Sequence, residues 1–476
     1  MRLRVEWGVS AGTHDASLCV MRNDKILFAS HSERFSKKKN DKDLHPDMIS
    51  YAVRKFGYPS KVYWYENPLT KATRKIYAGQ KNVWLSPKQY MAQYDILCPV
   101  VWGNHHESHA AAGYYTSPFD DAAVLVIDAI GEWTTTSIWN NVKCVYKKRY
   151  PSSLGLFYSA ITDRCELKPN EDEYILMGMA AYGDKTRFYA RLKDLYDSGV
   201  NLHKGCWEKT LDIKPEDYFD LAASAQALYE HELAKLLRKT RDLTGKRNLV
   251  FMGGCALNCL ANTMIDNYFD DHWIMPNPGD AGSSLGALLA AKKYRADWQT
   301  PYLGYDIVGD YPVDDLLEEL LTNKIVGVAN GRAEFGPRAL GNRSLLADPR
   351  GTEMKDLVNK IKKRQEFRPF APVVLEEQAS EFFHVKQGFA SPYMQHVVRC
   401  KFPEKFPAIV HKDGTSRVQT INKDQHAGLY DLMVRYTEAT GCPILLNTSL
   451  NIKGMPMVND KEDAKKFTEK YGVKVF

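Results

Sequence analysis

The sequence predicts a two-domain α/β protein whose N-terminal domain repeats one structural unit. The chain has 476 residues, which is too long for one ordinary hydrophobic core. Residues 3–33 and 122–149 follow the same order of strand, polar loop, strand, turn and strand, which indicates an internal duplication. Residues 295–312 contain two prolines and two glycines without apolar periodicity. We therefore expect a connector there, between domains at 1–300 and 310–476.

The first copy of the repeat consists of three apolar runs, LRVEWGV, ASLCVMR and KILFASH, with the polar loop SAGTHD after the first run. The second copy consists of AAVLVID, TTTSIWN and KCVYKKR, with the loop AIGEW in the corresponding place. Two such units are typical of the actin-like and sugar-kinase superfamily, in which the paired loops face a nucleotide cleft. An unrelated α/β fold with two hairpins is the alternative.

The remaining elements follow from local patterns. Residues 217–245 have the apolar periodicity of a long helix. KRNLVFM predicts a strand that enters the Gly253-Gly254 turn, and CALNCLANTMID predicts a helix after it. LGALLAAKKY and VDDLLEELLTNK predict helices on either side of the connector, and KIVGVANG predicts a buried strand.

Composition excludes several classes of protein. Hydrophobic residues make up 44% and charged residues 26%, and the mean hydropathy is −0.42, so neither disorder nor a fibrous repeat is indicated. The sequence has no apolar run long enough to span a membrane, and MRLRVEWGVSAGTHD does not resemble a signal peptide, so we expect a cytoplasmic protein. The nine cysteines include no CxxC pair, which favours reduced thiols. The net charge of +6 favours anionic partners such as phosphates or nucleic acid.

A histidine pair predicts a metal site. His105 and His109 stand one turn apart where the Ala-rich run after Asn104 begins a helix, and this spacing suits chelation of a divalent cation. Two imidazoles leave positions for oxygen ligands, and Asp128 and Asp280 are the candidates. Ordinary surface or cap chemistry is the alternative for such a pair. We expect His106 to play a supporting role.

Small residues predict a ligand site near the middle of the chain. Gly253 and Gly254 follow an apolar strand and precede a helix with Asn258, which lets a ligand approach the backbone closely. The loop NPGDAG again places small residues before a helix, so the two segments are candidates for two walls of one nucleotide site. The alternative is a pair of tight turns that only satisfy packing.

Cationic and amide side chains gather in the C-terminal part. The loop GRAEFGPRALGNRS presents Arg338 and Arg343, whose planar guanidinium groups suit phosphate oxygens. Further candidates for binding an anion-rich substrate are Lys362, Arg364, Arg368, His411, Arg417, Asn447, Ser449 and Asn451. The alternative is a solvated basic surface, although the rigid segments GPRALG and FRPFAP favour a preformed binding site.

The whole pattern resembles the O-carbamoyltransferase family found in nodulation-factor and antibiotic tailoring. The matching strings, in order, are HDAS, SERF, HHESHAAA, IDAIGEW, SLGLFYSAIT, MGMAAYGD, GGCALN, NPGDAGSSLGA, EFGPRALGNRS, FRPFAP, DGTSRVQ and LLNTSLN. The resemblance implies an N-terminal actin-like domain, akin to that of the tRNA threonylcarbamoyl transferases, and a C-terminal YrdC-like domain. Asn40, Gln365 and Met455 depart from the family pattern.

The resemblance also implies a two-stage reaction. Carbamoyl phosphate and ATP would form carbamoyl adenylate in the C-terminal domain, at positions that include Arg338 and Arg364. The N-terminal domain would then transfer the carbamoyl group to an acceptor hydroxyl, with a divalent metal, Fe2+ in preference to Mg2+, held at the four predicted ligand positions. We expect His14 to accept the hydroxyl proton; the alternative is that His14 only buttresses Asp15.

The acceptor is inferred from residues 61–94, which interleave cations with aromatic rings. The cations are Lys61, Lys71, Arg74, Lys75, Lys81 and Lys88, and the rings are Tyr63, Trp64, Tyr65, Tyr77, Trp84, Tyr90 and Tyr94. This pairing favours DNA that contains a hydroxymethylated pyrimidine such as 5-hydroxymethylcytosine. The alternatives are a sugar hydroxyl of a small natural product, a threonylcarbamoyl-type tRNA modification, and a non-catalytic ATP-binding protein.

Overall fold

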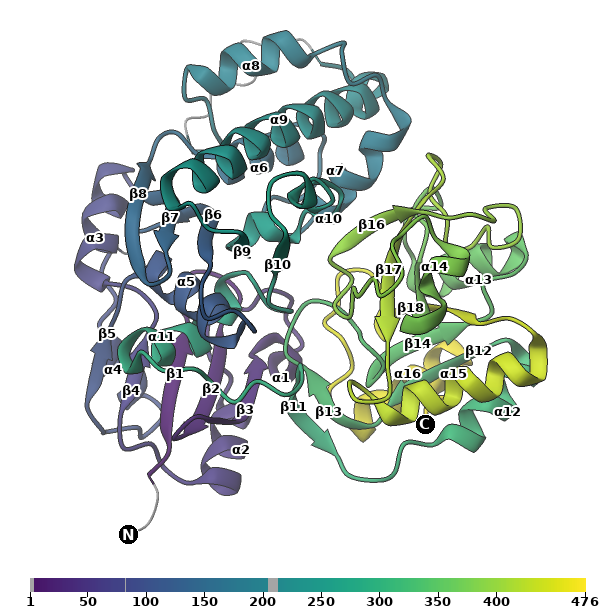
Figure 1. Ribbon diagram of the computed structural model, residues 1–476. Coiled ribbons are helices and arrows are strands. Elements are labelled where there is room, and N and C mark those ends of the chain that lie inside the picture. Colours follow the sequence, from purple (N-terminus) through teal and green to yellow (C-terminus); the bar gives the residue numbers. More distant parts are fainter. Residues whose placement is uncertain (1–3, 82, 204–212) are drawn as a thin grey trace. The chain divides into compact units, whose positions relative to one another are not determined.

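The structure is a computed structural model that describes residues 4–81, 83–203 and 213–476 (Figure 1). The chain divides into two compact units. Unit 1 comprises Met1–Leu27 and Lys42–Trp298, and unit 2 comprises Phe28–Asp41 and Gln299–Phe476. Both units mix strands and helices, which confirms the predicted fold class. No sequence pattern indicated that residues 28–41 group with the C-terminal half of the chain.

Two sheets built mainly from unit 1 have the same topology. Their strand orders are β3-β2-β1-β4-β5 and, read in the corresponding direction, β8-β7-β6-β9-β10. In each sheet the first strand of the repeat pairs antiparallel with the second and parallel with the fourth. This match confirms the duplication. The strands are β1 (Glu6–Ser10), β2 (Ser17–Arg22), β3 (Lys25–His31), β4 (Val62–Trp64), β5 (Val100–Trp102), β6 (Ala123–Gly131), β7 (Thr134–Asn140), β8 (Lys143–Arg149), β9 (Asn248–Met252) and β10 (Asp271–Trp273).

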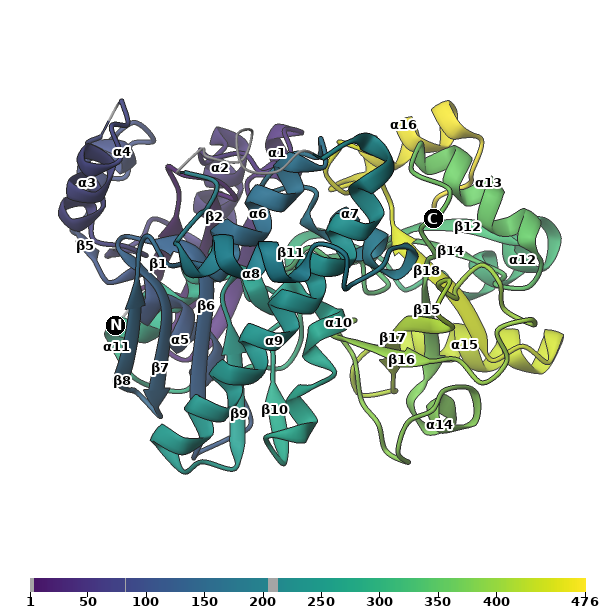
Figure 2. The ribbon, with the colours of Figure 1, turned by 90° about the horizontal axis from the view of Figure 1, so that it is seen from above.

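Helices connect and cover these two sheets. Helices α6 and α9 both contact β6, and Figure 2 shows them on the same face of the second sheet. The α-helices are α2 (Pro46–Phe56), α3 (Pro68–Tyr77), α4 (Pro87–Ala92), α5 (His105–Thr116), α6 (Leu154–Arg164), α7 (Glu173–Met179), α8 (Tyr189–Asp197), α9 (Tyr218–Thr244), α10 (Cys259–Asn262) and α11 (Ser283–Lys292). Short 3-10 helices lie at Ala180–Tyr182, Pro215–Asp217, Gly254–Leu257, Ile265–Asn267 and Asp280–Gly282.

Helices α5 and α11 pack closely because a glycine stands at their contact. A Cβ atom on Gly286 of α11 would lie 1.9 Å from the carbonyl oxygen of Ser108 on α5. No other residue type fits this separation. The contact fixes α5, which carries the histidine pair, against the segment that begins with Asp280.

The predicted helix over 255–266 is wrong in detail, because the segment breaks into a 3-10 turn, the single turn α10 and a second 3-10 turn. The physical reason is competition from side-chain amides. The Asn258 side chain accepts a hydrogen bond from the Ala261 amide at 3.1 Å and so starts a new helix at α10. Asn262 donates to the Ala256 carbonyl at 2.9 Å and holds the preceding turn.

Unit 2 contains a mixed six-stranded sheet of order β12-β14-β18-β15-β17-β16. Within this sheet the pair β15 and β17 is parallel. The strands are β12 (Ile325–Ala329), β14 (Arg343–Ala347), β15 (Ala371–Leu375), β16 (His396–Arg399), β17 (Thr415–Ile421) and β18 (Ile444–Ser449). The helices are α1 (Glu33–Ser36), α12 (Val313–Asn323), α13 (Thr352–Lys362), α14 (Ala379–Phe382), α15 (Ala427–Thr440) and α16 (Lys461–Tyr471), with a 3-10 turn at Glu376–Gln378. Val326, Val373 and Leu445 are fully buried in its core.

The predicted connector is only partly irregular. Strand β11 (Tyr302–Ile307) lies inside it and pairs antiparallel with β13 (Gly331–Glu334). The run YLGYDI is short, and its partner strand follows more than twenty residues later, so the local pattern did not distinguish it from a loop.

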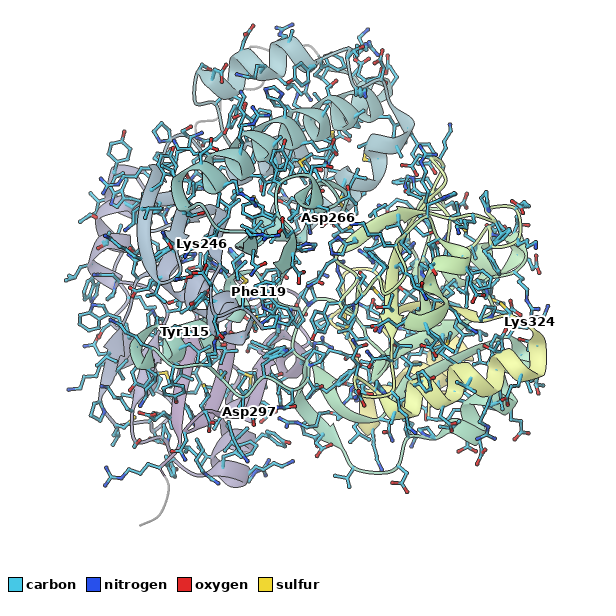
Figure 3. All side chains as sticks on the ribbon, in the orientation of Figure 1. Tyr115, Phe119, Lys246, Asp266, Asp297 and Lys324 are labelled. Atoms are coloured by element: carbon cyan, nitrogen blue, oxygen red, sulfur yellow. The ribbon has the colours of Figure 1, made fainter. Side chains whose placement is uncertain are left out.

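The segment before this connector is fastened to unit 1. Arg295 donates hydrogen bonds to the carbonyls of Tyr114 at 3.1 Å and Ser117 at 2.7 Å, and it also contacts that of Phe119. The Asp297 amide donates to the Asp24 carbonyl at 2.9 Å. Figure 3 labels Phe119 and Asp297 at this anchorage. Among the described residues, no helix is both long and apolar enough to cross a membrane.

Candidate metal centre and active site

Four buried side chains meet in unit 1. His105 and His109 extend from the first turns of α5, Asp128 from within β6, and Asp280 from the 3-10 turn before α11. His105 Nε2 lies 3.1 Å from Asp128 Oδ2, and His109 Nε2 lies 3.2 Å from Asp280 Oδ1. One ligand atom from each residue falls within 4.8 Å of all the others. The structure therefore brings together the four residues that the sequence predicted as metal ligands.

The orientation of His109 fits a metal ligand. Its Nδ1 lies 3.1 Å from the Pro278 carbonyl oxygen, which only accepts, so Nδ1 carries the proton and the Nε2 lone pair points into the cluster. His105 Nε2 stands 3.1 Å from His109 Nε2. Two imidazole nitrogens and two carboxylate oxygens are a donor set that suits a divalent cation.

Both carboxyl groups are anionic at neutral pH. Burial acts to raise the pKa of Asp280, but His105, His14 and His109 hold it well below its usual value. For Asp128, burial and Asp280 raise the pKa, whereas His105 and His109 lower it to about 2. The same carboxylates raise the pKa of His105 well above its usual value against the effect of burial, so a proton on this imidazole offsets part of their charge and a bound divalent cation would replace that proton.

A buried ion pair supports His105 from behind. Glu66 Oε2 lies 3.7 Å from His105 Nδ1, and the same carboxylate pairs with Lys71. Lys71 also contacts Thr13 Oγ1, which stands 3.1 Å from the Tyr65 hydroxyl. Carboxylates behind ligating imidazoles orient the ring and raise its basicity. The sequence alone did not indicate this role for Glu66, because no spacing rule connects it to residue 105.

Glu132 in the β6–β7 loop organises the same region. Its carboxylate accepts hydrogen bonds from the amides of Asn67 at 2.7 Å and His105 at 3.2 Å. It also accepts one from the Asn104 side chain at 2.9 Å. One acidic residue therefore fixes the starts of both α3 and α5. The string IDAIGEW contains this glutamate, but its partners lie far away in sequence.

His106 faces away from the cluster. Its ring nitrogens lie 2.8 Å from Ser137 Oγ and 3.0 Å from the Thr134 carbonyl oxygen. Burial and the neighbouring His105 hold its pKa well below the usual value. A neutral imidazole bonded to β7 is a structural support for α5, in keeping with the role expected for it.

His14 lies at the open edge of the cluster. Its Nε2 is 3.6 Å from Asp280 Oδ2 and its Nδ1 is 3.2 Å from Asp15 Oδ2, while 35% of its side chain is exposed. Burial opposes protonation, but Asp280 and Asp15 raise the pKa of His14 to about 9. His14 thus contacts both the cluster, where it was predicted to accept the hydroxyl proton, and Asp15, which it was alternatively predicted to buttress.

The Gly253-Gly254 turn contacts the cluster directly. Gly253 has φ of +91°, and a Cβ atom there would lie 2.1 Å from the Ile127 carbonyl oxygen. Its amide donates to the Pro278 carbonyl at 2.9 Å, and the Gly254 amide lies 3.3 Å from Asp128 Oδ1. The two small-residue segments predicted as walls of one site are therefore adjacent. Asn258 instead pairs its amide with Gln226 at 2.9 Å.

In unit 2, Lys362 lies beside two of the predicted polar residues. Its Nζ is 3.0 Å from Ser449 Oγ and 2.7 Å from Asn451 Oδ1. Burial lowers the pKa of Lys362 well below its usual value, and Arg364 and Arg368 lower it further. A buried lysine among cations is an environment that a bound anion stabilises.

The other predicted anion-binding residues differ in their surroundings. Arg364 donates to Asn359 Oδ1 at 2.8 Å and stacks over the Phe370 ring, and Asn447 donates to Gln419 Oε1 at 2.6 Å. Arg338, Arg368, His411 and Arg417 are all partly exposed. Met455, which departs from the family pattern, contributes its backbone carbonyl to Asn451 at 2.6 Å.

Arg343 does not present a free fork to a ligand. It is fully buried, and its guanidinium donates to backbone carbonyls that include those of Asn330 at 2.9 Å, Tyr305 at 3.0 Å and Asn459 at 3.0 Å. Because these carbonyls accept the hydrogen bonds of the guanidinium group, we assign Arg343 a structural role in holding its loop and do not assign it to phosphate binding. The sequence showed the cation but not the carbonyl groups around it.

The mixed cationic and aromatic segment is partly core. Tyr63, Trp64, Tyr65 and Tyr90 are buried, as are the cations Lys71 and Arg74. Most of these buried residues come from β4 and α3, which pack inward, whereas Lys81 and Lys88 are exposed. Tyr77 and Trp84 are exposed to 69% and 54%.

With both the fold and the site described, known proteins provide a comparison. Residues 74–289 match the family model described as the carbamoyltransferase N-terminus, and residues 317–476 match the carbamoyltransferase C-terminus. Nodulation protein NolO of Bradyrhizobium diazoefficiens is 34% identical over 76% of this chain and 75% of its own. Protein sll1178 of Synechocystis, described as uncharacterized, is 31% identical over 96% of this chain and 93% of its own. The α/β fold and buried donor cluster define a two-domain enzyme scaffold, and the chain belongs to the carbamoyltransferase family.

Solved structures of low identity also match part of the chain. Component A of the (R)-2-hydroxyglutaryl-CoA dehydratase of Acidaminococcus fermentans is 11% identical, with a TM-score of 0.34, over 61% of this chain and 98% of its own. Full-length HypF is 13% identical, with a TM-score of 0.33, over 61% of this chain and 55% of its own.

Proposed function

We propose that the protein is an ATP-dependent O-carbamoyltransferase. ATP, carbamoyl phosphate and one water would give carbamoyl adenylate, pyrophosphate and phosphate. An acceptor hydroxyl would then attack the carbamoyl carbon, and AMP would leave with the bridging oxygen. Membership of the carbamoyltransferase family supports the transfer. The buried set of His105, His109, Asp128 and Asp280 is the observation that carries the assignment of a metal-assisted site to unit 1.

The adenylate-forming site is assigned to unit 2. Lys362, held by Ser449 and Asn451, and the neighbouring Arg364 and Arg368 supply the positive charge for two polyanionic substrates. Arg338 and Arg417 are partly exposed and add donors for phosphate oxygens. Arg343 is left out of this set because backbone carbonyls engage its guanidinium.

Transfer is assigned to unit 1. A divalent cation held by the four ligand residues would supply Lewis acidity toward the phosphate and carbonyl oxygens of the adenylate. We assign the proton of the acceptor hydroxyl to His14 Nε2, which is partly exposed and lies beside Asp280. A divalent cation bound by Asp280 would neutralise its carboxylate. This would remove the main cause of the raised pKa of His14.

Release of pyrophosphate tests the first half-reaction. We expect pyrophosphate from ATP only when carbamoyl phosphate is present, and a rate that falls to background in Lys362→Met. Lys360→Met is the matched control, because Lys360 is exposed two residues earlier on α13. Binding of ATP without pyrophosphate release under these conditions would favour the non-catalytic alternative.

For the acceptor, we propose 5-hydroxymethylcytosine in DNA ahead of a sugar hydroxyl of a natural product. The net charge of +6 and the exposed rings of Tyr77 and Trp84 support this order. The match to the carbamoyltransferase C-terminus disfavours a threonylcarbamoyl-type reaction on tRNA. Mass spectrometry should detect one added carbamoyl group on hydroxymethylated DNA. Carbamoylation of an aminoglycoside or chitooligosaccharide, with the DNA unmodified, would overturn the acceptor assignment alone.

A further inference from the structure

Arg74 is a buried cation that forms no salt bridge with any described residue, although the charge of Glu66 acts on it. It lies on α3 with 5% of its surface exposed. Its Nη1 donates a long hydrogen bond of 3.3 Å to Gln80 Oε1, and its buried Nε has no hydrogen-bond partner in the part of the chain that the structure describes. The nearby carboxylate of Glu66 is already paired with Lys71. A buried guanidinium with an unused N–H is costly, and a ligand that accepts this hydrogen bond offsets the cost.

Three aromatic rings gather beside Arg74. The Tyr77 ring lies 5.3 Å from the Trp133 ring and 6.3 Å from the Tyr150 ring, between centroids. Tyr77 follows Arg74 by three positions on α3, so the two side chains share a face of the helix. Burial and Tyr77 raise the pKa of the Tyr150 hydroxyl, and the positive charge of Arg74 acts to lower it.

The rings are held from within unit 1 but remain accessible. Trp133 donates its indole N–H to Thr73 Oγ1 at 3.2 Å, and the Tyr150 amide donates to the Trp133 carbonyl at 2.9 Å. Tyr77 is 69% exposed, and Trp133 and Tyr150 are partly exposed. The combination is a fixed aromatic surface with an unsatisfied cation at its base.

This surface is coupled to the candidate metal centre by Glu132, the residue before Trp133. Glu132 binds the His105 amide and the Asn67 amide at the start of α3. The central strand β6, which carries Asp128, has β7 on one side and β9 on the other. Trp133 precedes β7 and Gly253 follows β9, and these two strands are the neighbours of β6 in the sheet (Figure 1).

We infer that Arg74, Tyr77, Trp133 and Tyr150 form the acceptor subsite, and that it takes a nucleotide. The base would lie against the rings, and a phosphate oxygen would accept the hydrogen bonds of Arg74. The inference rests on the proposed function, since it names the substrate class of the transfer site. A free nucleotide and a nucleotide within a strand present the same base and phosphate, so both are tested as sources.

The test is direct binding, measured by titration calorimetry on the full chain without ATP or carbamoyl phosphate. The probes are 5-hydroxymethyl-dCMP, the nucleoside without its phosphate, and a short single strand that contains the modified base. We expect the nucleotide to bind about tenfold more tightly than the nucleoside, and Arg74→Gln to remove this difference. Arg54→Gln, on the exposed face of α2, is the charge-matched control and should bind like the wild type. Binding of the strand but not the free nucleotide would identify the source as nucleic acid.

Tyr77→Ala keeps the test valid if Arg74→Gln fails to fold, because Tyr77 is largely exposed. We expect it to weaken binding of nucleotide and nucleoside alike, while Tyr58→Ala, at 64% exposure, has no effect. Wild-type protein that binds neither nucleotide nor strand would overturn the inference. Loss of ATP affinity in Arg74→Gln would also overturn it, because the pocket would then serve the co-substrate. Pyrophosphate release by the wild type reports separately on the proposed function.

Discussion

His105 Nε2 lies 3.1 Å from His109 Nε2, and both nitrogens face the carboxylate of Asp280 at 3.4 Å and 3.2 Å. Two imidazole nitrogens approach this closely only when a proton or a cation lies between them. One helical turn sets the spacing of the pair, and the packing of α5 against α11 sets its distance from Asp280.

Replacing His109 should abolish metal binding. We expect His109→Ala to retain its far-ultraviolet circular dichroism, to fall to background metal content by elemental mass spectrometry, and to lose carbamoyl transfer. His384→Ala, an exposed imidazole in unit 2, is the control and should keep the wild-type metal content. Equal metal content in the two variants would remove the site.

Glu66 should tune the same site without touching the metal. In Glu66→Gln the ring of His105 loses its negatively charged support, and we expect metal affinity to fall about 10- to 100-fold. Competition with a fluorescent chelator measures this change. An unchanged affinity would mean that the 3.7 Å contact does not orient His105.

The two half-reactions should separate by mutation. We expect Arg338→Ala to abolish carbamoyl-adenylate formation, whereas His14→Asn forms the adenylate but does not transfer the carbamoyl group. Pyrophosphate release and product mass measure the two steps, and Arg399→Ala on the exposed edge of β16 controls for loss of charge. If His14→Asn also stopped pyrophosphate release, the division of labour would be wrong.

Gly253 should be essential for stability. In Gly253→Ala the new Cβ atom meets the Ile127 carbonyl at 2.1 Å, and φ of +91° is unfavourable for alanine. We expect a loss of about 1–3 kcal/mol, seen as a lower Tm in calorimetry. Gly279→Ala is the control, because φ there is −79° and nothing lies within 4 Å of its Cβ position. Equal effects of the two substitutions would contradict the strain argument.

His426 should make unit 2 sensitive to acid. It lies 2.7 Å from Asn342 Oδ1 and accepts from the Leu429 amide at 3.0 Å, and burial lowers its pKa from 6.5 to about 4. Between these values the unfolded chain binds a proton that the folded protein does not, so stability falls as the pH falls. We expect this residue to contribute about 1.4 kcal/mol per pH unit in that window.

Denaturant unfolding at several pH values measures the slope. His426→Asn, which can still cap α15 but does not titrate, should flatten it between pH 6.5 and 4. His384→Ala should leave it unchanged. A slope equal to that of the wild type in His426→Asn would show that another group causes the acid sensitivity.

Local patterns predicted the elements that depend on near neighbours. The six strands of the repeat, the helix α9 and the His105/His109 spacing were all readable because burial imposes a period of about two or 3.6 residues. Local patterns did not predict elements whose structure depends on contacts outside the local pattern. Strand β11 is one case, because its partner strand lies beyond an intervening helix, and α10 is another, because Asn258 interrupts the helix there. The role of Arg343 was also not predictable, because the sequence does not show whether a guanidinium group binds phosphate oxygens or backbone carbonyls.

By itself, the sequence determined the α/β class, the duplication and the identity of the candidate ligands, because these are properties of residue type and spacing. Only the tertiary structure decided that Asp280 reaches His109 across 171 residues, that Glu66 and Lys71 support His105, and that the buried Nε of Arg74 finds no hydrogen-bond partner among the described residues. The physical reason is that charge, pKa and ligand geometry depend on distances through space, and the packing of whole sheets and helices sets those distances.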